Sequence, residues 1–338
     1  MVFDTKKYNI PKLLDQHTRE KLLAAIAENG YAVVDNFIDP DITNKIRSET
    51  PYPEATINTN CLGPSIHGDT QFFTNIIAHS QEVHDVITSS FVIDLCTGYL
   101  GNNFLLINNR IQTTRSKIAM PWHTDNNRLE DGKLVGRHDL PGLQFVLYLA
   151  EVGQSPFQFI KGSEKWSLSF PNQYLLDADI LEQHLEIVEI YPSAGTLLIL
   201  NTHVFHRAAP LKDDAYTRSI LLFQVDSVSD RYPGHGEKLL IQPEFLKEIT
   251  PEIQTLLGFG RKRAYPAFPE TSLLTLKVRH LLILQSQVFK ALPMIFFKKV
   301  LKLVLPPFIV TVFKNKSVSD RSQRMAPSEA PSNPYIDQ

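Results

Sequence analysis

Apolar residues recur at helical spacing in the N-terminal part of the chain. In residues 18–29 they form one face of a helix that ends at Gly30, a residue type that often follows a helix. Residues 39–46 open with Asp-Pro-Asp, and acidic residues in a first turn favour a second helix there. Residues 82–100 repeat the helical spacing and are also followed by a glycine, whereas residues 31–38 have the pattern of a short strand. This part is therefore predicted to be mainly helical.

Beyond residue 103 the pattern changes to short apolar or β-branched runs that turn residues separate. These runs occupy residues 104–107, 110–114, 143–149, 157–160, 195–200 and 219–225. Such a succession is typical of an all-β barrel or a double-sheet jelly roll. Residues 173–187 interrupt it with a predicted helical insertion, and helical spacing returns from about residue 233.

The two patterns together predict a mainly β core with helices on both sides. We expect helical and strand elements that pack on the core in residues 1–103, and the β core itself in residues 104–226. Residues 227–316 are predicted to form a helical extension. Residues 317–338 are rich in Ser, Pro, Asn and Asp, and this composition predicts a disordered tail.

Composition places few restrictions on this picture. The chain has 338 residues, 43% of them hydrophobic, and a formal net charge of −2, so a large core is feasible and nothing indicates a nucleic-acid partner. Cys61 and Cys96 are too few and too far apart for a disulfide framework or a CxxC metal site, and we expect two buried, reduced thiols. The N-terminal residues do not resemble a secretory signal. A cytoplasmic location is the expectation.

Residues 279–313 are unusually apolar but contain interspersed lysines. Lysine and proline cut every apolar run below the roughly 20 residues that a membrane-spanning helix needs, so a transmembrane helix is not expected. Two interpretations stay open. The segment either forms helices that pack on the β core or on a partner subunit, or it lies on a membrane surface as a basic amphipathic element. The second would make the protein membrane-peripheral and suit a lipid-like substrate.

Residues 121–125, Pro-Trp-His-Thr-Asp, contain the first candidate metal ligands. One residue separates His123 from Asp125, and on a strand this spacing places both side chains on the same face. On its own the pair is weak evidence, because it occurs by chance in many chains. A second histidine from a distant strand would complete a facial triad, which holds Fe(II) on one side and leaves the other positions open.

His203 and His206, in Asn-Thr-His-Val-Phe-His-Arg, compete for the third position. Alternation along a strand puts them on opposite faces, and His206 is closer in sequence to Arg218. The separation from His206 predicts that Arg218 lies on the following antiparallel strand, near the same depth of the barrel. A guanidinium binds a carboxylate through two parallel hydrogen bonds, so Arg218 is the candidate anchor of a carboxylate co-substrate. We therefore predict His123, Asp125 and His206 as the metal ligands.

Four segments carry a resemblance to a known family. They are residues 28–38 (a helix end that runs into Asn-Gly-Tyr and an apolar run), 121–125 (similar to WHxD), 155–164 (similar to NGxLxxxPGSH) and 194–207 (similar to GDxxxFxxxxxHR). These segments resemble the phytanoyl-CoA dioxygenase family of Fe(II)/2-oxoglutarate oxygenases. The resemblance covers about residues 15–226.

Two departures from the family pattern are visible. Ser155-Pro156 and residues 161–164 replace the Asn-Gly and Pro-Gly-Ser-His of the turn, and Thr196 replaces the aspartate of the Gly-Asp pair. Neither place is an expected ligand position, so iron binding is not questioned. The two departures do change the substrate contacts that are expected from the turn.

The resemblance implies a double-stranded β-helix, which is a jelly-roll, cupin-like core, with Fe(II) bound by His123, Asp125 and His206. Arg218 would pair with the C5 carboxylate of 2-oxoglutarate, and a polar group on the preceding strand would assist, with Gln112 as the first choice and Asn108 as the second. Halogenating relatives carry a small residue in place of Asp125. The carboxylate therefore favours hydroxylation of an unactivated C–H bond in a small metabolite or lipid-like molecule, with O₂ consumed and 2-oxoglutarate converted to succinate.

Two alternatives to a 2-oxoglutarate-dependent dioxygenase stay open. A metal-dependent cupin enzyme that does not use 2-oxoglutarate would need no buried arginine facing the metal. A non-catalytic, membrane-associated scaffold would need neither the ligands nor the arginine. The sequence identifies neither the substrate nor the oligomeric state.

Overall fold

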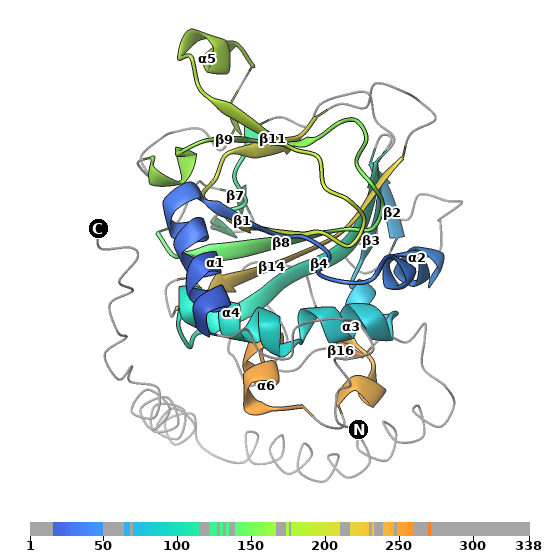
Figure 1. The fold of residues 1–338 in the computed structure, drawn as a ribbon. Helices are drawn as coiled ribbons and strands as arrows, with labels where there is room; N and C mark the ends of the chain where they lie inside the picture. The colour runs from blue at the N-terminus through green and yellow to red at the C-terminus, as the bar shows by residue number, and fades with distance from the viewer. Residues whose placement is uncertain are drawn as a thin grey trace. The chain divides into compact units, whose positions relative to one another are not determined.

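The computed structural model describes residues 16–49, 64–67, 70–114, 122–126, 129–130, 133–134, 139–166, 174–175, 177–209, 217–229, 232, 239–246, 249–259 and 270–271. In these residues the strands form two larger antiparallel sheets, and helices cover one face of the larger sheet (Figure 1). None of the helices in these ranges combines the length and the apolar character that crossing a bilayer requires. Mixed α and β structure with antiparallel sheets agrees with the coarse prediction from the sequence.

The N-terminal elements follow their apolar patterns closely. Helix α1 (Gln16–Asn29) ends where Gly30 takes a positive φ of 81°, and strand β1 (Tyr31–Val34) follows at once. Helix α2 (Pro40–Glu49) has the expected acidic first turn, and the Asp39 carboxylate accepts a hydrogen bond from the backbone N–H of Asp41. Strand β1 then joins the larger sheet by pairing with β12 (Leu197–Asn201).

The single helix predicted over residues 82–100 is divided in two. Helix α3 (Gln81–Ile87) ends at Thr88, whose hydroxyl donates to the carbonyl of His84. Helix α4 (Ser90–Leu100) starts anew with the Ser89 side chain as its N-cap, accepting from the N–H of Val92. Local hydrogen bonds of these two hydroxyl side chains compete with a continuous helix.

The larger sheet has seven strands in the order β1-β12-β8-β14-β4-β3-β2. Neighbouring strands are antiparallel throughout, and several neighbours are far apart in the sequence. The strands not yet introduced are β2 (Pro64–His67), β3 (Thr70–Thr74), β4 (Phe104–Thr114), β8 (Gly142–Tyr148) and β14 (Arg218–Ser227).

The second sheet has five short strands in the order β10-β5-β13-β9-β11. They are β5 (Trp122–His123), β9 (Phe157–Ile160), β10 (Tyr174–Leu175), β11 (Ile187–Ile190) and β13 (His206–Ala208). Within the predicted insertion at residues 173–187, α5 (Asp177–Glu182) is helical while β10 and the start of β11 are strands. A separate pair joins β6 (Leu129–Glu130) to β7 (Lys133–Leu134).

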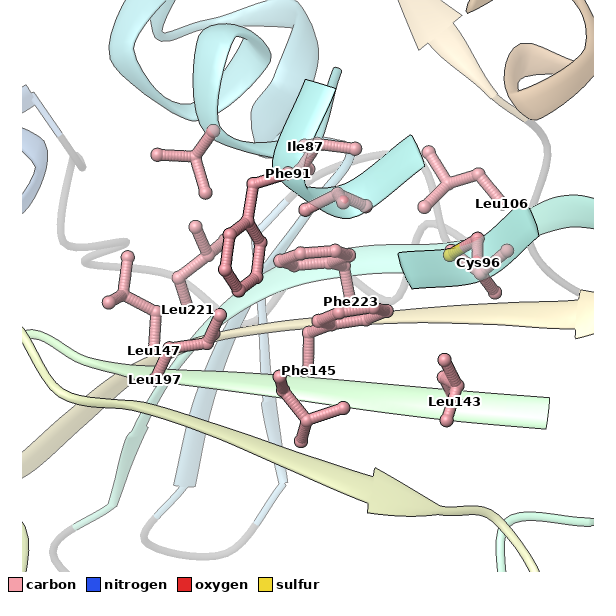
Figure 2. Packing of buried hydrophobic residues seen from close by; sticks show 14 of the residues in the cluster. Ile87, Phe91, Cys96, Leu106, Leu143, Phe145, Leu147, Leu197, Leu221 and Phe223 are labelled. Carbon is pink, nitrogen blue, oxygen red and sulfur yellow. The ribbon is translucent and has the colours of Figure 1, made fainter. Parts of the chain in front are cut away.

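Alternation of side chains gives the larger sheet two different faces. Odd-numbered residues of β8 and β14 pack with α3 and α4 in one buried cluster, in which the rings of Phe145 and Phe223 stack with centroids 4.6 Å apart (Figure 2). Full burial of such a side chain contributes about 1.5–3 kcal/mol to folding. Even-numbered residues such as Val146 and Leu222 point the other way and belong to a second cluster with β9. Figure 1 shows the larger sheet between these helices and the β9–β11 side of the smaller sheet.

Strand β4 contains a bulge that changes which residues face which side. Leu106 pairs with Val225 and Asn108 pairs with Gln224, so Ile107 is the extra residue of a β-bulge between these two pairs. Leu106 therefore packs in the cluster on the helix side, whereas Asn108 contacts Gln224 on the other face. Such an insertion shifts the alternation by one residue. The even-numbered residues after the bulge consequently face the smaller sheet.

The region after β14 is described only in part. It contains β15 (Leu240–Ile241), the 3₁₀ turn η4 (Pro243–Leu246), helix α6 (Pro251–Leu257) and β16 (Glu270–Thr271), which pairs in parallel with β15. Leu256 and Leu257 of α6 belong to the helix-side cluster. The apolar segment 279–313 and the predicted tail 317–338 lie outside the described residues, and the four-part division of the chain remains a prediction.

Candidate metal centre

Pairing of two short strands brings the two predicted histidine ligands together. His123 ends β5 and His206 begins β13, and the two residues are direct partners across this antiparallel pair. Their ring centroids lie 4.5 Å apart. In an antiparallel pair, directly opposed side chains are on the same face of the sheet. The smaller sheet thus supplies both imidazoles from residues far apart in the sequence.

Asp125 lies against both histidines. Its Oδ1 is 3.8 Å from Nε2 of His123, and its Oδ2 is 3.3 Å from Nε2 of His206. One ligand atom from each of the three residues can be chosen so that all lie within 4.8 Å of one another. The structure therefore gathers the predicted triad at one place.

Burial and charge act in opposite directions on these groups. Burial alone would lower the pKa of His206, but the Asp125 carboxylate outweighs it and raises that pKa above its usual value. Burial alone would raise the pKa of Asp125, but His206, with smaller effects from His123 and Arg110, holds it well below its usual range. Asp125 is therefore an anion near neutral pH, as a metal ligand must be.

Hydrogen bonding sets the orientation of His206. Its Nδ1 lies 3.0 Å from the backbone carbonyl of Val204, which can only accept, so this nitrogen carries the proton. In the neutral ring the other nitrogen, Nε2, which faces Asp125, is the one available to bind a metal, an arrangement often seen in metal-binding histidines. His203 instead contacts the side chain of Asn201 at 3.1 Å and is not in the triad.

In the structure, strand alternation does not separate His203 from His206. Residues 202–205 form a turn between β12 and β13, and β13 starts only at His206. The two histidines are separated by this turn rather than by opposite faces of one strand. Arg218 also differs from expectation: its strand, β14, is the next after β13 but belongs to the other sheet.

The turn that precedes His206 is tied to the segment that follows His123. The carbonyl of Thr202 accepts hydrogen bonds from the backbone N–H groups of Asp125 and Asn126, at 3.2 and 3.1 Å. The side chain of Asn126, fully buried, donates to the carbonyl of Leu140. These bonds hold the carboxylate ligand in place relative to the second histidine.

Two glutamines of the larger sheet reach Asp125 from the opposite side. The amide of Gln144, on β8, donates to Oδ2 of Asp125. The amide of Gln224, on β14, donates to the backbone carbonyl of Asp125 at 3.3 Å and to the buried carboxyl of Asp226 at 2.9 Å. Gln144 was not singled out in the sequence. The sequence nevertheless distinguishes this residue, because Gln144 is the one amide in an otherwise apolar and aromatic strand.

Asp226 is a fully buried carboxyl group at the end of this network. Burial raises its pKa to about 7, with the charge of Asp125 acting in the same direction and hydrogen bonds from Gln224 and Tyr232 acting against it. A neutral carboxyl group therefore predominates below pH 7 at this position.

Arg218, the predicted co-substrate anchor, is buried at the start of β14 with 5% of its surface exposed. Its Nη1 donates to the backbone carbonyl of Ser155 at 2.8 Å and to the hydroxyl of Ser155 at 3.2 Å. Ser155 has a positive φ of 59°, and its hydroxyl donates to the carbonyl of Ala209. The turn that departs from the family pattern therefore contacts this arginine.

One cavity connects the triad with Arg218. Its walls come from β4, β8 and β14 of the larger sheet and from the smaller sheet: Arg110, Gln112, His123, Asp125, Gln144, Val146, Tyr148, Phe157, His206, Ala208, Arg218, Ile220 and Leu222. Gln112, the first choice for an assisting polar group, lines the cavity, whereas Asn108, the second choice, is absent from its walls. Arg110 and Phe157 also line the cavity and were not predicted from the sequence, although Arg110 lies two residues before Gln112 and so shares its face of β4. Phe157 stacks on His206 with centroids 5.3 Å apart.

The donor set fits a divalent metal ion of the iron type. Two imidazole nitrogens and one anionic carboxylate on one side of a cavity are the ligands of a facial triad, in which the remaining coordination positions face the open space. A buried guanidinium on the wall of the same cavity suits a carboxylate that is itself removed from water. The residues present therefore agree with the chemistry of Fe(II) and a dicarboxylate co-substrate.

Comparison with known proteins gives a family and several structural neighbours. The sequence model of the phytanoyl-CoA dioxygenase family matches residues 26–219, more than half of the chain. HygX from Streptomyces hygroscopicus, solved with nickel and 2-oxoglutarate bound, is 15% identical, with 64% of this chain and 94% of that chain covered at a TM-score of 0.48. The non-haem α-ketoglutarate-dependent epimerase SnoN of nogalamycin biosynthesis is 14% identical, with 64% and 85% covered and a TM-score of 0.49.

Proposed function

Since the chain belongs to the phytanoyl-CoA dioxygenase family, we propose that it is an oxygenase in which His123, Asp125 and His206 bind Fe(II) and Arg218 binds 2-oxoglutarate. Fe(II), 2-oxoglutarate and O₂ are the cofactor and co-substrates of this family. We further propose that the two antiparallel sheets form the double-stranded β-helix that this chemistry uses, with the cavity between them.

One observation carries the proposal. Three ligand atoms of the correct types lie within 4.8 Å of one another on the wall of a cavity that also contains a buried arginine. A scaffold would need none of these groups, and a cupin that does not use 2-oxoglutarate would not need the arginine. The planar guanidinium of an arginine matches a carboxylate, so the place of Arg218 on this wall favours an anionic co-substrate.

The roles of the protein's own groups follow from their contacts. Nε2 of His206 and of His123, together with the Asp125 carboxylate, would hold the metal, while Gln144 orients that carboxylate. Arg218, positioned by Ser155, would bind the C5 carboxylate of 2-oxoglutarate. Gln112 lies on the same wall and would assist, in preference to Asn108. When bound, the iron centre supplies O₂ activation coupled to decarboxylation of 2-oxoglutarate to succinate.

We propose hydroxylation of an unactivated C–H bond as the reaction. The carboxylate of Asp125 occupies the position at which halogenating relatives have a small residue, which supports hydroxylation over halogenation. The substrate is proposed to be a small metabolite or a lipid-like molecule. Val146, Tyr148, Ile220 and Leu222 give the cavity apolar walls that exclude water from the reacting groups.

Anaerobic titration of the protein with Fe(II) and 2-oxoglutarate tests the proposal. We expect the visible charge-transfer band of an iron-bound 2-oxo acid, followed by succinate release when O₂ is admitted. The band should be lost in His206→Ala and kept in His203→Ala, which is the matched control because His203 contacts Asn201 instead of the triad. In Arg218→Gln the KM for 2-oxoglutarate should rise by about 100-fold. An active, iron-loaded protein that releases no succinate would instead support a cupin enzyme.

The C-terminal segment 279–313 has two proposed roles, both drawn from its sequence alone. It either packs on the β core or on another subunit, or it contacts a membrane surface and gives access to a lipid-like substrate. A cytoplasmic location, with a membrane-peripheral one as the alternative, likewise remains a proposal.

A further inference from the structure

The face of the smaller sheet that points away from the triad contains a group of contacts that the proposed function does not use. Trp122 immediately precedes His123, and Arg207 immediately follows His206. Since successive side chains of a strand point to opposite faces, Trp122 and Arg207 lie on the face opposite the two imidazoles. The guanidinium carbon of Arg207 lies 4.3 Å from the centroid of the Trp122 ring. The sequence neighbours of both histidines therefore contact each other behind the site.

A single carboxylate oxygen joins these two neighbours. Oδ1 of Asp177 accepts a hydrogen bond from Nε1 of Trp122 at 2.9 Å and another from Nη1 of Arg207 at 2.6 Å. Trp122 is buried, with 1% of its surface exposed, and its indole N–H can only donate. A buried donor needs an acceptor, because leaving it without one costs free energy. Asp177 therefore satisfies the buried indole and pairs with the cation through the same atom.

Asp177 comes from a third segment, the insertion at residues 173–187. Strand β10 of this insertion pairs with β5, and α5 begins at Asp177, two residues after β10 ends. Ile180 of α5 is buried in one cluster with Trp122 and Phe205. Figure 1 shows α5 beyond the smaller sheet, on the side away from the larger sheet. The insertion is thus fixed to the outer side of the smaller sheet by an apolar contact and a polar one.

The contact between Asp177 and Arg207 differs from an ordinary surface ion pair, although the Asp177 side chain is 67% exposed. A surface pair between two mobile side chains contributes little, because water screens the charges and ordering the side chains costs entropy. The side chain of Arg207 is only 13% exposed. The Trp122 ring holds its face, and the side-chain oxygen of Gln158 accepts from its Nε at 2.8 Å. The guanidinium is therefore already ordered where it meets the carboxylate.

Given that the triad binds Fe(II) as proposed, we infer from these contacts that Asp177 is a positioning residue for the metal centre. In the part of the chain that the structure describes, the ladder between β5 and β13 consists of one residue pair, His123 and His206. Contacts behind that pair therefore contribute to the alignment of the two strands. By holding Trp122 and Arg207 together, the Asp177 carboxylate fixes the orientation of both imidazoles relative to each other.

Anaerobic titration with Fe(II) at saturating 2-oxoglutarate tests this role. We expect Asp177→Ala to raise the Kd for Fe(II) by about tenfold, as when an outer contact of a metal ligand is lost. The visible band should also broaden, since the imidazoles would adopt more than one orientation. Asp177→Asn keeps an oxygen for the indole but loses the charge, so its Kd should lie between those of wild type and Asp177→Ala. A merely structural role would lower the urea concentration of unfolding and change neither the Kd nor the band.

Two further variants distinguish this coupling from a general effect. Combining Asp177→Ala with Arg207→Gln should weaken Fe(II) binding by less than the product of the two single effects, because both changes break the same ion pair. Gln158→Leu is the matched control. Gln158 is already the partner of Arg207 in the ladder between β9 and β13, so the Fe(II) affinity of this variant should equal that of wild type.

The outcomes that contradict the positioning role are distinct from failure of the proposed function. Equal Fe(II) affinity and an unchanged band in wild type and Asp177→Ala would overturn the proposal. So would single effects that multiply fully in the double variant, or a loss of affinity in Gln158→Leu as large as in Asp177→Ala. A wild-type protein that binds no Fe(II) would instead refute the metal centre itself, and the positioning role with it.

Discussion

At the scale of single residues, the amide of Gln144 has the most direct effect on a ligand. It donates to the Asp125 oxygen that also faces His206, so it restricts the orientation of the carboxylate. Outer contacts of this kind tune metal affinity, and their loss typically weakens it by about 10–100-fold.

Replacing Gln144 by Leu should therefore raise the Kd for Fe(II) by about 10–100-fold while the fold is retained. The measurement is an anaerobic Fe(II) titration at saturating 2-oxoglutarate, with circular dichroism to check folding. Gln158→Leu is the control, since Gln158 bonds to Glu189 and Arg207 and does not line the cavity. Equal Fe(II) affinity in wild type and Gln144→Leu would show that the amide does not orient the ligand.

Asp226 gives a prediction on pH. Its pKa is about 7 in the folded protein and near 4 when unfolded, so between these values the folded state binds one more proton than the unfolded state. The stabilising contribution of this group is therefore complete below about pH 4 and is lost as pH rises to about 7. For one group, the free energy of unfolding falls by at most about 1.4 kcal/mol per pH unit across that window.

Asp226→Asn removes this titration. In metal-free protein, urea denaturation at pH 5 and pH 8 should show a smaller fall in the free energy of unfolding for the variant than for wild type. At pH 8 the variant should be at least as stable as wild type, because no buried carboxylate remains. Parallel pH profiles for the two proteins would contradict this account of Asp226.

At the scale of elements, strand existence was easier to predict than strand pairing. β8, β12 and β14 are apolar runs and were found from the sequence, but nothing local indicates that β14 lies between β4 and β8. The division between α3 and α4 was missed because the apolar spacing continues across Thr88 and Ser89, whose capping bonds break the helix. The structure brings His206 to the cluster with His123 and Asp125, although residues 202–205 are a turn and not part of a strand. Pairing and turns depend on contacts between distant residues, which a local pattern does not contain.

Gly195, two residues before β12, is a position that requires glycine. Its φ is +84°, and a Cβ built on it would lie 2.2 Å from the backbone carbonyl oxygen of Ile38, the residue whose N–H bonds to the carbonyl of Gly195. Gly195→Ala should therefore lower the free energy of unfolding by about 3 kcal/mol, through backbone strain and displacement of residue 38. Urea denaturation measures this. Gly153→Ala is the control, because a Cβ there meets nothing within 4 Å; equal stabilities of the two variants would exclude the steric explanation.

At the scale of the whole molecule, the role of residues 279–313 can be decided by one deletion. If the segment packs on the core or on a partner subunit, a chain without residues 280–316 should unfold at lower urea concentration and show the same weak vesicle binding as the full chain. We expect this result, since lysines and prolines interrupt the apolar runs. Co-sedimentation with vesicles of phosphatidylcholine and phosphatidylserine is the second measurement. Vesicle binding by the full chain that the deletion abolishes would establish the membrane role instead.

The bulge at Ile107 in β4 makes the chemistry of this cavity depend on the spacing of the chain as well as on its composition. Removing that one amino acid would restore a regular ladder and rotate one half of the strand by half a turn relative to the other. If the part of β4 before the bulge kept its packing, the odd-numbered neighbours of Arg110 and Gln112 would face the cavity in place of these two residues. The metal ligands, which lie on other segments, would not change. A homologue one residue shorter here could therefore preserve the iron ligands and yet recognise a different molecule.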